Sequence, residues 1–199
     1  MSKSKISAEP AYPIETARLS IRLLSAADEA LYCDLYTNAE VMRFIGPPLS
    51  RDHAARCFRK ALALTVQKTF ERRVQVLTER ATRQAIGISG IHLTDTQRGR
   101  AEIGTLLRTA SHAQRFAPEY CVPLLTASFA RPQVKELWAH VPKGHAATEH
   151  LLIKLGFSRG VDVLDSARHP AGCRWSITRA VWSKRHPAAV AVAVGMEQE

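Results

Sequence analysis

The stretch from Glu102 to Tyr120 reads EIGTLLRTASHAQRFAPEY, and it indicates the fold when it is taken together with the segments on either side. A carboxylate opens the short apolar run from Glu102 to Arg108, which is typical of a buried strand. A polar segment with small residues follows from Thr109 to Gln114. Pro118 is then expected to open a helix, because its missing N–H is not needed there. A strand, a tight loop and a helix N-terminus together offer free N–H groups and a favourable dipole to a phosphate.

Length and composition indicate one soluble globular domain. The 199 residues are 46% hydrophobic and 23% charged, which is enough to bury a core. Residues 1–13 lack the apolar segment of a signal peptide, and no run reaches the roughly 18 apolar residues of a membrane span. We therefore expect a cytoplasmic protein with no membrane partner.

The charge balance favours an anionic partner without identifying it. The chain has 28 Lys and Arg residues against 18 Asp and Glu residues, a formal charge of +10. Such a charge suits nucleic acid, an anionic cofactor or an acidic protein. The basic residues are spread along the chain with no dense block, so nucleic acid is not expected as a partner. It is kept as a third hypothesis, which predicts binding that falls steeply with salt.

The cysteines give no sign of a metal site. Cys33, Cys57, Cys121 and Cys173 are widely scattered, with no spacing suited to zinc. We interpret them as small buried residues and predict no metal.

The predicted elements follow the order of a mixed α/β domain. Residues 16–24 alternate as a half-buried strand does, and Ser25 with Asp28 forms a capping box before a helix. Ser50 caps a second long helix, and Gly156 ends the last one. The remaining expected strands span residues 73–78, 85–93, 136–141 and 173–181.

Three regions are expected along the chain. Residues 1–14 form a flexible arm, residues 15–182 the domain, and residues 183–199 a C-terminal tail. The tail contains AAVAVAV, which could pair at a sheet edge and give a homodimer.

Four stretches resemble the GNAT (Gcn5-related N-acetyltransferase) superfamily, within it the branch of the ribosomal-protein N-terminal acetyltransferases. They are ETARLSIRLLSAADEA (residues 15–30), AIGISGIHL (85–93), AEIGTLLR (101–108) and HLLIKLGF (150–157). The resemblance implies the GNAT acyl-CoA N-acyltransferase fold, an α/β fold with a mixed central sheet flanked by helices. It also implies acetyl-CoA as co-substrate and an amine acceptor. The amine, a protein N-terminus or a small molecule, would attack the thioester directly in a ternary complex.

The resemblance also implies where the cofactor binds. The pantetheine is expected along the central strand and the pyrophosphate over the loop and helix start. The family's Asn-x-x-Ser before the last cofactor helix falls on residues 145–148, where Thr148 keeps the hydroxyl group. The expected cofactor residues are Leu106, Leu107, Arg108, Gln114, Arg115, Phe116, Ala117, His145 and Thr148.

The chain departs from the family pattern at three places, one of which is His145, where the family's Asn-x-x-Ser has its asparagine. The family's loop of the form Trp-Gly-Lys-Gly-Tyr-Ala reads HAQRFA here, so both glycines are missing, and Arg115 either distorts the loop or contacts phosphates. The tyrosine that protonates the leaving thiolate in many relatives falls at Leu152. These departures support an alternative, a catalytically degenerate GNAT-fold protein with a binding or regulatory role. A longer acyl-CoA is the other enzymatic alternative.

Several side chains are candidates for catalysis and acceptor binding. Glu102 is the candidate general base if burial raises its pKa, although it could instead pair with Arg100 or Arg108. His92 titrates in the useful range but could be structural, and Tyr120 is a possible acid. Aromatic residues of the first helices could line the acceptor pocket or belong to the core: Tyr32, Tyr36 and Phe44.

Overall fold

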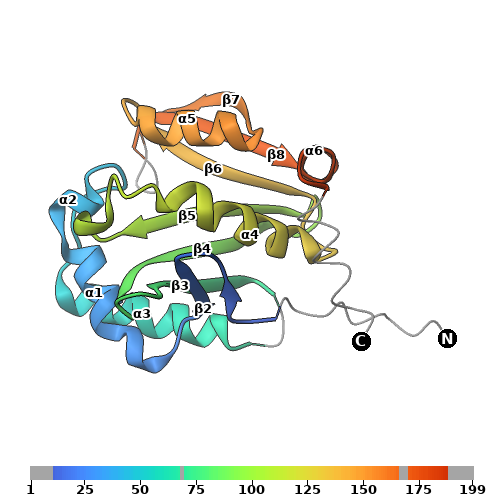
Figure 1. Cartoon of the computed structure of the whole chain (residues 1–199). Helices are drawn as coiled ribbons and strands as arrows, with labels where there is room; N and C mark the ends of the chain where they lie inside the picture. Colours follow the sequence, from blue (N-terminus) through green and yellow to red (C-terminus); the bar gives the residue numbers. More distant parts are fainter. Residues whose placement is uncertain (1–10, 68–69, 166–169, 188–199) are drawn as a thin grey trace.

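A single mixed sheet runs through the computed structural model, which describes residues 11–67, 70–165 and 170–187 (Figure 1). Its order is β1-β2-β3-β4-β5-β6-β8-β7, and the pair β5–β6 is parallel while the other neighbours are antiparallel. The strands are β1 (Ile14–Glu15), β2 (Leu19–Leu23), β3 (Arg72–Glu79), β4 (Ala85–Asp95), β5 (Arg100–Leu107), β6 (Glu136–Pro142), β7 (Ser158–Val163) and β8 (Gly172–Thr178).

Helices cover both faces of this sheet (Figure 1). They are α1 (Glu29–Thr37), α2 (Ala39–Met42), α3 (Arg51–Thr65), α4 (Phe116–Ala130), α5 (Ala146–Leu155) and α6 (Arg179–Arg185), with short 3-10 turns η1 (Ala26–Asp28) and η2 (Thr109–Ser111). The predicted caps are confirmed. The Ser25 N–H and hydroxyl both donate to Asp28 at 2.8 Å, Ser50 accepts from the His53 N–H, and Gly156 is left-handed after α5.

Three buried clusters join the layers. Below α1 and α3, residues such as Leu35 and Phe58 pack on Val76 and Leu106 of the sheet. On the opposite face, α4 and α5 pack on β4, β5, β6 and β8, and a third cluster joins the start of α4 to β2 and β3. Side chains alternate between the faces of a strand, so Ala101 and Ile103 of β5 face α4 and α5, whereas Glu102 and Leu106 lie on the α1–α3 face.

Two of the expected elements need correction, and one strand was not expected. The last strand ends at Thr178 rather than at residue 181, because Thr178 caps α6 by accepting from the Val181 N–H. Helix α4 begins at Phe116, two residues before Pro118, because Pro118 still lies in the first turn, where backbone N–H groups need no partner. Strand β7 was not expected, since its side chains are mostly exposed and no alternating pattern marks them.

The chain outside the central domain is only partly described. Tyr12 and Ile14 pack against the cluster beneath α4, and Trp182 of α6 is fully buried. The AAVAVAV segment lies outside the described residues, so the domain limits and the sheet-edge dimer stay predictions. No helix within the described ranges is both long and apolar enough to cross a membrane.

Candidate active site

The parallel strands β5 and β6 separate after a short paired section. They pair only at Arg100–Glu136, Ala101–Leu137 and Glu102–Trp138, and Figure 1 shows them diverging toward the end of the molecule that carries α1 and α2. From Ile103 onward, β5 keeps its ladder with β4 but presents its other edge toward the opening. This exposed edge offers backbone groups to a bound chain. Leu106 is 7% exposed, and its side chain packs in the cluster beneath α1 and α3.

The loop after β5 keeps the left-handed conformation although it has no glycine. Ala113 and Arg115 both have φ of +59°, and they stand where the family pattern has its two glycines. Within the described chain, no hydrogen bond uses the N–H groups of Ala113, Gln114 or Arg115. Arg115 is the N-cap of α4 and its side chain is exposed. The loop therefore adopts at both positions a left-handed conformation that glycine usually takes, and free donors stand at the N-terminus of a long helix.

The start of α5 lies across the opening from this loop. The Thr148 hydroxyl is 3.2 Å from a ring nitrogen of His145, and the His145 ring lies 4.2 Å from the Phe44 ring, centroid to centroid. Burial lowers the pKa of His145, and the nearby Arg43 and His112 lower it further, so the ring is neutral at pH 7. The structure thus brings Phe44, a predicted acceptor residue, into contact with His145, a predicted cofactor residue.

Glu102 lies in a polar row that crosses the sheet. Its Cα is in register with His92 on β4 and with Trp138 on β6, and such partners project from the same face. Glu102 is half-buried and His92 is exposed. The two arginines near it in sequence also contact other carboxylates: Arg100 Nε is 3.2 Å from Glu136, and Arg108 Nη2 is 3.9 Å from Asp34.

Tyr120 lies on the other face of the sheet. It belongs to the cluster beneath the start of α4, is 5% exposed, and burial raises its pKa, so the phenol keeps its proton. Its neighbour Cys121 is half-buried, and the loss of solvation raises the pKa of that thiol to about 12. Glu102 and His92 are therefore brought together, and Tyr120 is placed apart from them.

An open groove lies between α1 and the end of β5. Tyr32 and Tyr36 do not line it; their ring centroids are 4.5 Å apart and they pack with Phe58 between α1 and α3. Asp34 at its rim also bonds Arg51 Nη1 at 3.0 Å. The lining residues are Asp34, Leu35, Asn38, Val41, Arg108, Thr109 and Ala110.

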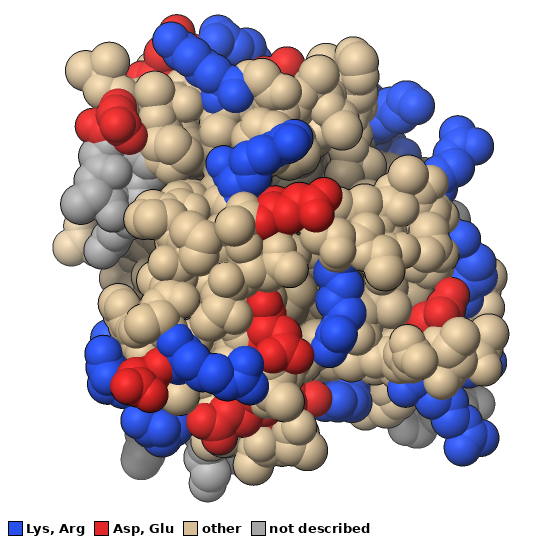
Figure 2. Space-filling model, turned by 90° about the vertical axis from the view of Figure 1, so that its left-hand side faces the viewer, with Lys and Arg blue, Asp and Glu red and all other residues tan. Residues whose placement is uncertain are grey.

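Figure 2 shows this end of the molecule. Acidic and basic side chains alternate on it and do not separate into a patch of one sign. That distribution gives no support on this face to the nucleic-acid hypothesis, which needs a basic surface.

A family model described as an acetyltransferase (GNAT) domain matches residues 18–158, well over half of the chain. The chain belongs to the GNAT acetyltransferase family. The predicted fold and enzyme class are thereby confirmed.

Solved structures of GNAT proteins share this fold. A spermidine N-acetyltransferase from Vibrio cholerae, in complex with CoA and spermine, is 19% identical with a TM-score of 0.71, over 83% of this chain and 98% of that one. A GNAT acetyltransferase from Bacillus anthracis is 14% identical with a TM-score of 0.67, over 83% and 97%. A Vibrio cholerae protein provisionally assigned as a ribosomal-protein-serine acetyltransferase is 19% identical with a TM-score of 0.66, over 86% and 99%. No curated protein sequence matches.

Two residues near the GNAT loop were not among the expected site residues. Arg18 and Glu119 are joined by an ion pair of 2.8 Å between Nε and Oε2, and Arg18 reaches the loop backbone. In the sequence they are two residues of opposite charge that lie far apart, and no pattern indicates that they pair. No group of His, Cys, Asp and Glu side chains in the described ranges could hold a metal ion.

Proposed function

We propose that this GNAT protein transfers the acetyl group of acetyl-CoA to a primary amine by direct attack in a ternary complex. The observation that carries the proposal is the loop between β5 and α4. It keeps two left-handed residues without glycine, beside the opening between β5 and β6. The left-handed conformation is energetically unfavourable for residues other than glycine. Unfavourable backbone conformations of this kind are typical of ligand-binding sites, so their presence supports a loop that still binds its ligand.

The residues around the opening fit a CoA molecule. The free N–H groups of residues 113–115 and the N-terminus of the 15-residue helix α4 suit a pyrophosphate, and the exposed Arg115 side chain adds a positive charge. The free edge of β5 from Ile103 to Leu107 suits the amide groups of pantetheine. The Thr148 hydroxyl at the start of α5 is a further polar contact.

The side chains support an acid–base role on the acceptor side. Bound acetyl-CoA supplies a thioester, whose carbonyl carbon the amine attacks as the thiolate leaves. We assign Glu102 as the base that takes the amine proton, directly or through one water, and His92 beside it as the group that passes this proton to solvent. Tyr120 stays the candidate acid because its phenol is protonated at neutral pH, although burial raises its pKa and so makes it a weaker proton donor.

The acceptor is proposed to enter along the groove between α1 and β5. The groove carries Asp34, whose carboxylate contacts Arg51 and Arg108, so its negative charge is already balanced. That arrangement and the formal charge of +10 favour an acceptor less cationic than a polyamine. Two candidate acceptors for a test come from the names of the structural neighbours: a polyamine, and a peptide with an N-terminal serine.

Calorimetric titration of the purified protein with acetyl-CoA, beside desulfo-CoA, tests cofactor binding first. Micromolar binding is expected. An amine panel of spermine, neutral peptides and acidic peptides with N-terminal serine should follow, with longer acyl-CoA molecules in parallel. Absence of binding up to millimolar acetyl-CoA would refute the proposal, whereas binding without transfer to any amine would favour the non-catalytic alternative.

The variant Glu102→Gln tests the assigned base. It should lower the rate of transfer by about 100-fold or more, the usual range for a general base, with little effect on acetyl-CoA affinity. Glu29→Gln, at an exposed position on α1, is the matched control and should leave the rate unchanged. An unchanged rate in Glu102→Gln would remove this residue from the mechanism.

A further inference from the structure

One arginine from the start of the chain holds the backbone of the cofactor loop. Arg18, in the turn before β2, donates from Nη1 to the Gln114 carbonyl at 3.0 Å and from Nη2 to the Arg115 carbonyl at 3.2 Å. These two carbonyls follow each other in the loop. The guanidinium is a rigid planar fork, so it fixes the relative orientation of the two groups it bonds, which a single ammonium cannot do.

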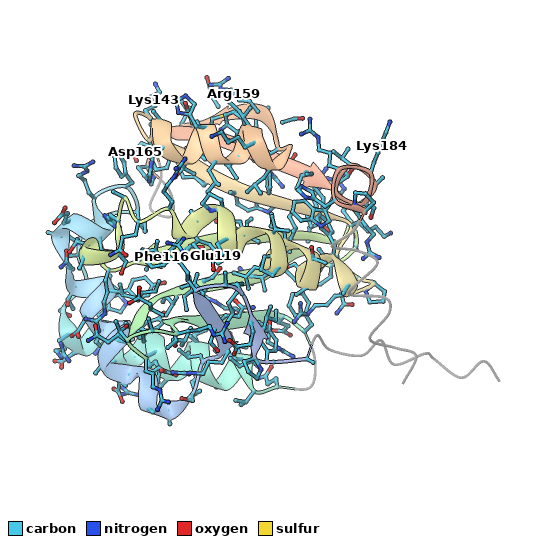
Figure 3. All side chains as sticks on the ribbon, in the orientation of Figure 1. Phe116, Glu119, Lys143, Arg159, Asp165 and Lys184 are labelled. Atoms are coloured by element: carbon cyan, nitrogen blue, oxygen red, sulfur yellow. The ribbon has the colours of Figure 1, made fainter. Side chains whose placement is uncertain are left out.

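Four further contacts hold Arg18 and its partner Glu119 in place. Arg18 Nε donates to Glu119 Oε2 at 2.8 Å, and the Arg18 backbone N–H donates to Glu119 Oε1 at 2.7 Å. The Thr16 hydroxyl donates to the same Oε1 at 2.6 Å. The guanidinium also lies 4.5 Å from the centre of the Phe116 ring. Figure 3 shows Phe116 and Glu119 together at the start of α4.

The Glu119 carboxylate is the anchor of this arrangement. Burial opposes its ionisation, but the hydrogen bonds from Thr16 and Arg18 outweigh that effect and lower the pKa of Glu119. The carboxylate is therefore charged at neutral pH, and Arg18 is held between it and the loop carbonyls.

The direction of these bonds matters for a ligand. In a trans peptide the C=O and N–H groups point in opposite directions. Holding the Gln114 and Arg115 carbonyls toward Arg18 therefore turns the N–H groups of Arg115 and Phe116 away from it, to the side where a phosphate can accept from them. The contact also opposes a backbone flip at Arg115, a non-glycine residue whose φ of +59° is unfavourable.

We propose that Arg18 is a positioning residue for the cofactor: its fork, anchored by Glu119, holds the glycine-free loop so that its N–H groups face the pyrophosphate of acetyl-CoA. The inference rests on the proposed function, because it assumes that acetyl-CoA binds at this loop. Arg18 itself contacts backbone and has no place in the chemical step.

The test compares Arg18→Ala and Arg18→Lys with Arg98→Ala, which removes one exposed arginine from the turn between β4 and β5. Calorimetry should show acetyl-CoA binding weakened about tenfold in Arg18→Ala, the usual effect of losing hydrogen bonds to a charged group. Arg18→Lys should recover only part of the affinity, because one ammonium cannot hold both carbonyls. Arg98→Ala should bind as the unaltered protein does.

Two readouts separate positioning from a general loss of structure. Acetyl-pantetheine, which lacks the pyrophosphate, should be used with an unchanged KM by Arg18→Ala, and kcat at saturating acetyl-CoA should stay within about twofold. In the ligand-free protein, hydrogen exchange in β6 should be the same in Arg18→Ala as in the unaltered protein, which shows that the fold is intact.

Each failure has a distinct meaning. If the unaltered protein does not bind acetyl-CoA, the proposed function falls. If it binds and Arg18→Ala binds equally well, the positioning role is overturned. Full recovery in Arg18→Lys would show that charge alone matters, and an equal loss with acetyl-pantetheine would show a structural role only; both overturn the inference. Should Arg18→Ala fail to fold, Arg18→Lys and Glu119→Gln carry the same comparison.

Discussion

Replacing Ala113 by glycine should make the protein more stable, which is opposite to the usual effect of glycine. Ala113 has φ of +59° and an exposed side chain, so the substitution removes no buried contact. The left-handed conformation costs an L-residue about 1–2 kcal/mol, and glycine returns about 0.5–1 kcal/mol of this as extra freedom in the unfolded chain. The free energy of unfolding should therefore rise by about 0.5–1 kcal/mol, which raises Tm by about 1–4 °C in a chain of this size.

Ala110→Gly is the matched control for this prediction. Ala110 is exposed in the same loop but lies in η2 and is not among the residues with positive φ. Glycine there should lower the free energy of unfolding by about 0.5–1 kcal/mol. Urea unfolding followed by circular dichroism measures both variants. If Ala113→Gly is destabilised as Ala110→Gly is, the loop does not hold Ala113 in the left-handed region and the reasoning is wrong.

Three other changes test the remaining parts of the structure. Trp182→Ala should lower the free energy of unfolding by about 3–5 kcal/mol, because this side chain is fully buried and bonds Thr126; an unchanged urea midpoint would remove α6 from the core. Asp28→Asn should lower the urea midpoint at pH 7. Burial opposes ionisation of Asp28, but hydrogen bonds from Arg22 and Ser25 lower its pKa. The stability that the native protein has over Asp28→Asn is therefore complete above about pH 4 and should vanish below it. A difference in urea midpoint that stays constant with pH would contradict the assignment. The native protein should lose stability as pH falls through about 6.5, because burial lowers the pKa of His145 and protonation then favours the unfolded chain. His145→Asn should not show this loss. Identical profiles of stability against pH in the two proteins would refute the prediction.

Local patterns in the sequence predicted most of the elements. The capping box at Ser25 and Asp28, the cap at Ser50 and the left-handed Gly156 are set by residues within four positions of each other, and all three are confirmed. The alternation of β2 and the apolar run of β5 likewise need only neighbouring residues. Strand β7 was missed because it is an exposed edge strand without alternation, and α6 because Thr178 changes from strand to cap.

For the candidate site residues, the sequence indicated which residue types to choose, but only the tertiary structure showed which of them lie together. Glu102 and His92 were each chosen from residue type, and their shared register could not be known before β4 and β5 were paired. The contact between Phe44 and His145 joins residues about a hundred positions apart, which no periodicity indicates. Tyr32 and Tyr36 face the core because α3 packs on α1, and that choice of helix face depends on tertiary packing.

The sequence by itself determined the strand, loop and helix from Glu102 onward, and with them the GNAT family, because these patterns are carried by adjacent residues. It could not decide whether a loop without glycine keeps its shape. The tertiary structure decided that, since it brings together Arg18 and Glu119, 101 positions apart, so that the Arg18 guanidinium bonds both the Glu119 carboxylate and the loop carbonyls. Backbone conformations that are locally unfavourable persist only where distant groups hold them, so the sequence around Ala113 and Arg115 does not contain the reason for their conformation.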